Sequence, residues 1–207
     1  MLEQTGMTTL DPKRAFFHVI DDHRWLAVSG CAWNLVGANA VNGIKSEARG
    51  LLPNVDVLAR DCLLMHARSL IKFYKDSSRR DTDIILSDFG VPPVGALLSD
   101  KLENFEYSIE VHLLHLTDWR DSDYRRLNAV GRDAKRDRAD WDRDATLMVR
   151  LIFEALNHAA NHTGKWRQPF KELYDSSTAR YGDKSFAWPA HLCEKSDVEN
   201  YLRSLGL

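Results

Sequence analysis

The sequence lacks long apolar runs and is poor in cysteine. No stretch approaches the ~18 consecutive apolar residues of a membrane span, and no basic-then-apolar leader opens the chain. We therefore expect no membrane partner. The three cysteines, Cys31, Cys62 and Cys193, are odd in number and far apart, which argues against a disulfide framework. They are typical of reduced thiols, so a cytoplasmic protein is expected.

An excess of one charge is also missing. Lys plus Arg number 28 and Asp plus Glu number 30, so the formal charge is -2. This balance excludes a whole-molecule field that would attract nucleic acid or an anionic membrane. Residues 131–144 interleave both signs and are predicted to be a solvated loop or helix edge. Any binding to a polyanion would need a local patch.

No alternation of apolar and polar residues predicts a strand, so the fold class is all-α. A chain of 207 residues can bury one sizeable core, and nothing in it requires a second domain. We expect residues 1–10 to be a flexible tail and residues 11–207 to be a single helical-bundle domain.

Apolar residues at helical spacing predict four main helices, and start signals place several of their ends. Asp11-Pro12 is a helix start, Asn54 is expected to cap the second helix, and Ser196 to Glu199 is a capping box that opens a short last helix. Pro169 is expected to interrupt a weaker helix over 165–174. The main helices are predicted from Pro12 past Leu35, from Asn54 to about Lys75, from about Val94 to Thr117, and from about Trp141 to His162.

His66 lies within an apolar stripe of the second helix, with Leu63, Leu70 and Phe73. One interpretation is a core histidine with one ring nitrogen bonded to a carbonyl or carboxylate. Arg60 precedes His66 by six residues, a rotation of about 120° and a rise of about 9 Å. The two side chains therefore cannot meet on one helix face.

Two further histidine groups lie on predicted helices. His112 and His115 are neighbours on one face, followed by Arg120, and Glu154, His158 and His162 step by four along another. Histidines at i and i+4 can present two nitrogens to one metal ion, which makes the second group an alternative metal site. No Glu-x-x-His pair of the di-iron kind accompanies it, and the primary expectation is no metal and no small-molecule cofactor.

A different chemistry would use a histidine and an arginine in one cleft. In RNA cleavage, a histidine moves the 2′-hydroxyl proton and an arginine stabilises charge on the phosphate. This mechanism requires the imidazoles of the central helices to gather in one groove.

The stretches "LLMHARSLIKFY", "RRDTDIILSDFG" and "HLLHLTDWR" resemble a family of uncharacterised bacterial helical proteins that is similar to the HEPN superfamily. The resemblance spans about residues 57–120. It implies an up-and-down bundle of four to five main helices, here with a short C-terminal helical extension, often assembled as a homodimer. Active members use an Arg-x4-6-His motif as a metal-independent ribonuclease, frequently in defence or toxin systems.

Carried onto this chain, the resemblance makes His115, His112, Arg120, Arg60 and His66 the candidate catalytic residues. Arg60 and His66 fit the motif spacing, whereas His115 occupies the place of the family's histidine. Glu110 stands five residues before His115, where the family pattern has Asn or Arg. We expect Glu110 to pair with a nearby arginine or to hold His115 in one tautomer.

Three functions remain open on the sequence. The first is a HEPN-like homodimer that binds or cleaves RNA. The second is a non-catalytic bundle that binds or regulates a partner and whose histidines are core and surface residues. The third is a metalloprotein that uses His158, His162 and Glu154.

Overall fold

The computed structural model describes residues 11–39, 52–75, 84–118, 138–180 and 188–207, and it is all-α over these ranges, without a strand. The predicted tail and residues 131–137 of the charged segment lie outside them. Within the described ranges no helix is apolar over the length that a bilayer crossing requires. The helices are α1 (Pro12–Asn39), α2 (Leu52–Lys75), α3 (Ala96–Asp118), α5 (Arg138–Asn161), α6 (Arg167–Arg180) and α7 (Lys195–Ser204), with 3₁₀ turns η1 (Leu86–Phe89) and η2 (Ala190–Leu192).

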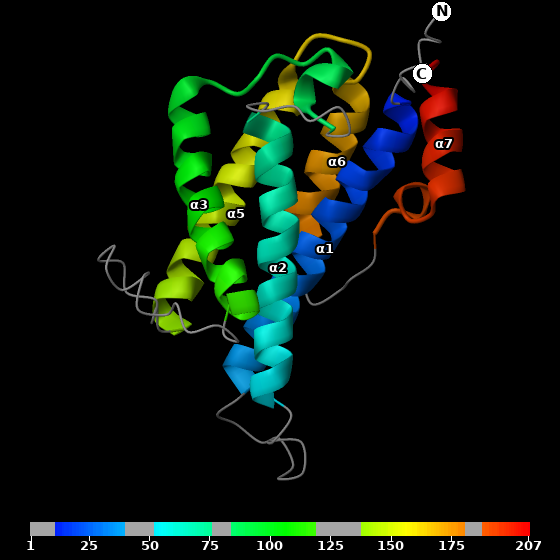
Figure 1. The fold of residues 1–207 in the computed structure, drawn as a ribbon. Coiled ribbons are helices and arrows are strands. Elements are labelled where there is room, and N and C mark those ends of the chain that lie inside the picture. The colour runs from blue at the N-terminus through cyan, green and yellow to red at the C-terminus, as the bar shows by residue number, and fades with distance from the viewer. Residues whose placement is uncertain (1–10, 40–51, 76–83, 119–137, 181–187) are drawn as a thin grey trace, which may run out of the picture.

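The helices α1, α2, α3, α5 and α6 run alternately down and up through one bundle (Figure 1). The pair α1 and α2 packs most extensively, α3 and α5 flank α2, and α6 lies between α5 and α1. The short α7 packs along α1 at one edge, where Arg24 Nη1 donates to the Cys193 carbonyl at 2.8 Å. The prediction of an all-α bundle with a short C-terminal helix is confirmed.

An aromatic cluster fills the core at the end of the bundle where α1 and α6 begin. Phe16 of α1 lies 5.2 Å from Phe170 and 5.3 Å from Trp166, measured between ring centroids. Phe89 of η1 lies 4.9 Å from Trp166, so the turn that follows α2 contributes to the core. Gly90 ends this turn at φ 69°, a left-handed conformation that favours glycine.

Several predicted helix ends differ from the structure. Asp11 is the N-cap of α1 as expected, because its Oδ1 accepts from the Lys13 amide at 3.0 Å. Asn54 is not a cap, since α2 begins at Leu52. Pro169 lies in the first turn of α6, where its missing N–H removes no helical hydrogen bond, and the helix continues to Arg180. The predicted capping box is wrong, because α7 begins at Lys195 after Glu194.

Candidate functional site

His66 forms a carboxylate–imidazole pair with a residue of the neighbouring helix. His66 Nδ1 lies 2.7 Å from Oδ1 of Asp22, which α1 presents to α2. The side chains are 22% and 24% exposed, so the pair lies at the margin of the core and is accessible from solvent. The interpretation of His66 as a histidine bonded to a carboxylate is confirmed, although the ring is not fully buried.

The Asp22 bond defines the chemical state of the neutral ring. An ionised carboxylate can only accept a hydrogen bond, so the proton of neutral His66 resides on Nδ1. Nε2 then carries a lone pair, and it makes no hydrogen bond to the described part of the chain. A histidine in this state can accept a proton from a bound molecule.

Two more side chains surround the pair. Ser69 Oγ donates to Oδ2 of Asp22 at 2.6 Å. Trp25, one turn after Asp22 on α1, stacks against the His66 ring at 6.1 Å between centroids and 13° between planes. Trp25 is 42% exposed and Met65 is 54% exposed, so an apolar surface adjoins the imidazole. Ser69, Asp22 and His66 do not form a hydrolytic triad, because the carboxylate lies between the hydroxyl and the imidazole.

Arg60 does not approach this pair. Its Nε bonds to Oδ1 of the adjacent Asp61 at 3.2 Å, in agreement with the prediction that Arg60 and His66 cannot meet on one face of α2. Arg60 and His66 of one chain therefore make no contact that would let them act on the same substrate group.

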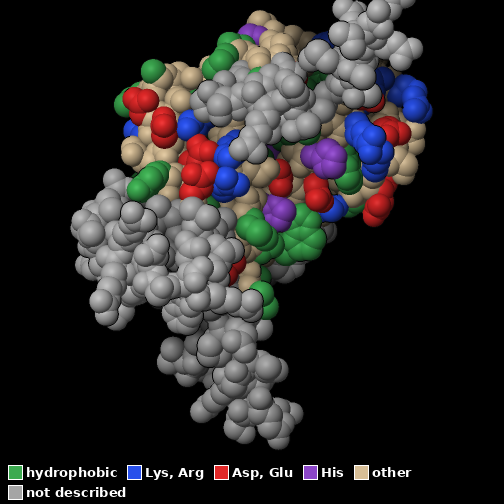
Figure 2. Space-filling view, viewed as in Figure 1, with side chains coloured by type: hydrophobic (Ala, Val, Ile, Leu, Met, Phe, Trp, Pro, Cys, Tyr) green, Lys and Arg blue, Asp and Glu red, His purple; other side chains and the backbone are tan. Residues whose placement is uncertain are grey.

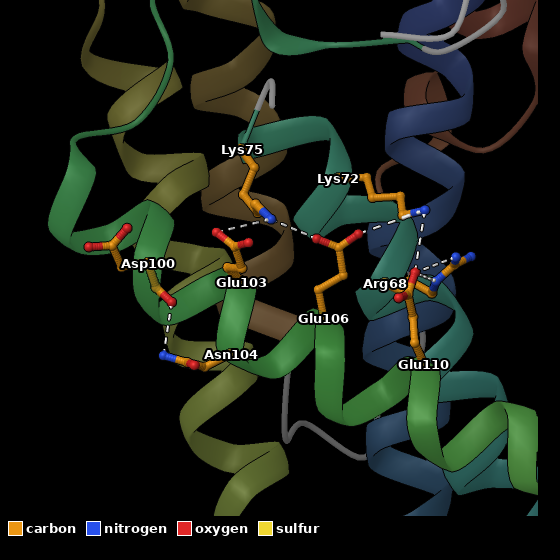
Figure 3. A network of polar contacts seen from close by, with 8 residues as sticks. All are labelled: Arg68, Lys72, Lys75, Asp100, Glu103, Asn104, Glu106 and Glu110. Atoms are coloured by element: carbon orange, nitrogen blue, oxygen red, sulfur yellow. Dashed lines mark hydrogen bonds and ion pairs between the residues drawn. The ribbon is translucent and has the colours of Figure 1, made fainter. Parts of the chain in front are cut away.

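The other cations of α2 pair with glutamates of α3 (Figure 3). Arg68 donates from Nη2 and Nε to Oε1 of Glu110, at 2.6 and 3.1 Å. Further along the pair of helices, Lys75 Nζ lies 2.8 Å from Glu106, and Lys72 lies 3.6–3.7 Å from both Glu106 and Glu110. The hydrogen bond from Arg68 lowers the pKa of Glu110, and the charges of Arg68 and Lys72 lower it further. The expected pairing of Glu110 with an arginine is confirmed.

These ion pairs neutralise the positive charges of Arg68, Lys72 and Lys75 on α2. Figure 2 shows acidic and basic side chains interspersed on the coloured surface, with histidines beside apolar and charged groups. The face that carries Arg68, Lys72 and Lys75 therefore presents little net field to a phosphate chain.

The remaining candidates are placed as follows. His112 and His115 belong to α3, but their side chains lie outside the described residues, as does Arg120. His158 Nε2–H donates to the Pro92 carbonyl at 3.0 Å, so this nitrogen is occupied. His158 and Glu154 line an open groove of about 500 Å³ with the start of α3. Within the described ranges no three His, Cys, Asp or Glu side chains converge to hold a metal ion, so Glu154, His158 and His162 form no such site.

A second histidine, His23, is fully buried and bonds a buried tyrosine. His23, next to Asp22 on α1, places Nε2 2.8 Å from the Tyr74 hydroxyl, and its Nδ1 has no partner among the described residues. Burial lowers the pKa of His23 from 6.5 to about 3, against the opposing effect of Asp22. Burial likewise raises the pKa of Tyr74 well above its ordinary value. His23, His66 and His158 thus bond different partners. The expectation that the imidazoles of the central helices gather in one groove stays a prediction, since the side chains of His112 and His115 lie outside the described residues.

Asp22, Ser69 and Trp25 were not among the predicted site residues. The available signal was the polar run Asp21 to Arg24 inside an otherwise apolar helix, together with a histidine on an apolar stripe of the next helix. Neither helix alone indicates that these side chains meet. Comparison of the chain with protein-family models, curated proteins and solved structures finds no match.

Proposed function

We propose that this protein is a HEPN-like, metal-independent ribonuclease in which His66 is the general base. The observation that carries the proposal is the Asp22–His66 hydrogen bond, which leaves Nε2 of a solvent-accessible imidazole able to accept a proton. The HEPN-like motif of the sequence includes this same histidine.

The proposed reaction transfers the 2′-hydroxyl proton of RNA to His66 Nε2. The 2′-oxygen attacks the adjacent phosphorus and the bond to the 5′-oxygen breaks, which yields a 2′,3′-cyclic phosphate and a 5′-hydroxyl protonated by water. Asp22 stabilises the imidazolium that forms, since its charge lies 2.7 Å from Nδ1. Arg60, His112, His115 and Arg120 are the candidate residues for phosphate contact.

The proposal includes a homodimer in the cytoplasm. A second copy would supply a cationic side chain to the His66 site, since Arg60 of the same chain bonds Asp61 and no other cation in the described part of the chain bonds His66 or Asp22. None of the three cysteines, all of which the structure describes, is in a disulfide, as expected for a reducing compartment. A size measurement by light scattering tests the dimer, for which twice the chain mass is expected.

A non-catalytic partner-binding protein is the second candidate. Leu58 and Met65 are seven residues apart on α2 and are 68% and 54% exposed, while the neighbouring cations are neutralised by glutamates. An apolar helix face beside a neutral one suits a protein partner better than RNA.

Incubation of labelled single-stranded RNA with the protein in EDTA tests the proposed reaction. We expect cleavage by the parent protein, a fall of about 10²-fold or more in His66→Ala, and a smaller fall in Asp22→Asn. His158→Ala is the matched control, because its ring bonds a backbone carbonyl instead of a carboxylate. His115→Ala tests the residue that the family pattern favours.

An RNA with a 2′-deoxy group at the cleaved position should resist cleavage. A parent protein without activity would refute the ribonuclease and favour the partner-binding candidate. A His66→Ala variant as active as the parent would refute His66 as the general base.

A further inference from the structure

We infer that Ser69 is a positioning residue for His66 and that it acts through Asp22. This inference rests on the proposed function for its catalytic consequence, whereas its effect on the His66 ring can be measured without RNA.

The geometry places one carboxylate between two side chains of α2. Asp22 Oδ1 bonds His66 Nδ1 at 2.7 Å and Oδ2 bonds Ser69 Oγ at 2.6 Å. His66 and Ser69 are three residues apart and so are neighbours on one helix face. With both oxygens held, the carboxylate cannot rotate about its terminal torsion without breaking a bond, although that torsion is soft in a free Asp.

The Ser69 hydroxyl bonds a residue of another helix. Hydroxyl groups inside helices commonly bond a carbonyl of the preceding turn. Thr178 and Ser204 do so here, with bonds to the carbonyls of Tyr174 and Tyr201. Ser69 instead donates across to α1, where the ionised acceptor makes the hydrogen bond stronger than one to a carbonyl.

Ser69 has a second effect because the site is accessible to solvent. Its hydroxyl occupies Oδ2, where water would otherwise compete for the carboxylate and draw it away from the imidazole. Trp25 stacks on the face of the His66 ring, and Asp22 bonds the ring at Nδ1. Because Ser69 holds the Asp22 carboxylate in place, it also constrains the direction in which Nε2 of His66 points.

Nitrogen-15 NMR of the His66 ring in Ser69→Ala tests the inference. We expect the proton population on Nδ1 of neutral His66 to fall in this variant and to be restored in Ser69→Thr, which keeps the hydroxyl. With RNA, we expect kcat to fall about 3- to 10-fold with little change in KM, and Ser69→Thr to recover it. Thr178→Ala is the matched control, since its hydroxyl bonds its own helix.

The outcomes separate the two proposals. An unchanged His66 ring in Ser69→Ala overturns the positioning role. A changed ring in a protein whose parent form does not cleave RNA supports the positioning role and refutes the ribonuclease. A changed ring with unaltered kcat overturns the catalytic consequence of Ser69.

Discussion

Asp22 and His23 are consecutive residues of α1 with opposite environments. Asp22 faces α2 at the margin of the bundle, where it meets His66 and Ser69. His23 turns into the core, where its ring lies parallel to Phe153 and bonds the Tyr74 hydroxyl. A rotation of about 100° along the helix separates the two environments. Imidazole chemistry is therefore accessible at His66 and suppressed at His23.

The hydrogen bond between Tyr74 and His23 should stabilise the fold. Tyr74→Phe would leave both ring nitrogens of His23 without partners in the core, at a cost of about 1–3 kcal/mol in the free energy of unfolding. Tyr201→Phe is the control, because the buried Tyr201 hydroxyl has no hydrogen-bond partner in the described part of the chain and its removal should cost nothing. Urea unfolding of both variants measures the difference, and equal losses would contradict the assignment.

Stability should fall in mild acid because of His23. The folded pKa of about 3 lies below the ordinary value of 6.5, so the unfolded chain binds the proton first as the pH falls. Above about pH 6.5, His23 does not change the free energy of unfolding with pH. Between about pH 6.5 and pH 3, the free energy of unfolding falls as the pH falls. At pH 5 we expect a loss of about 2 kcal/mol relative to neutral pH.

Urea unfolding at pH 7.5 and pH 5 measures this loss, and His23→Gln should remove it, since Gln can still donate to Tyr74. An NMR titration of the parent provides a second test. A His23 ring that protonates near pH 6 would contradict the expectation.

At the scale of elements, α2 and α3 are joined by a ladder of opposite charges at their shared edge (Figure 3). The cations of α2 recur at steps of four and three, at positions 68, 72 and 75, and the glutamates of α3 recur at 103, 106 and 110. These steps keep each set on one helix face, so antiparallel helices can pair them in sequence. The ladder matches the observed register of α3 against α2 and neutralises the cations on this face of α2.

The ion pairs of this ladder should contribute unequally to the free energy of unfolding. Glu106→Gln would remove the negative charge 2.8 Å from Lys75, whose side chain is 5% exposed, and we expect a loss of about 1–3 kcal/mol. Glu103 also pairs with Lys75, but it is 67% exposed at 3.7 Å, so Glu103→Gln should change stability by less than about 0.5 kcal/mol. Thermal or urea unfolding compares them, and a larger loss in Glu103→Gln would contradict this ranking.

At the scale of the whole molecule, the apolar pattern of the sequence determined the all-α class, a bundle of helices and most helix lengths, because helical periodicity is a local property. Helix ends were less predictable: Asn54 and Ser196 were expected at helix starts and Pro169 was expected to interrupt a helix, whereas α2 begins at Leu52, α7 begins at Lys195 and α6 continues past Pro169. The tertiary structure alone decided which side chains meet. Asp22 and His66 are 44 residues apart, and only the packing of α1 against α2 brings a carboxylate to one histidine while it buries the adjacent His23.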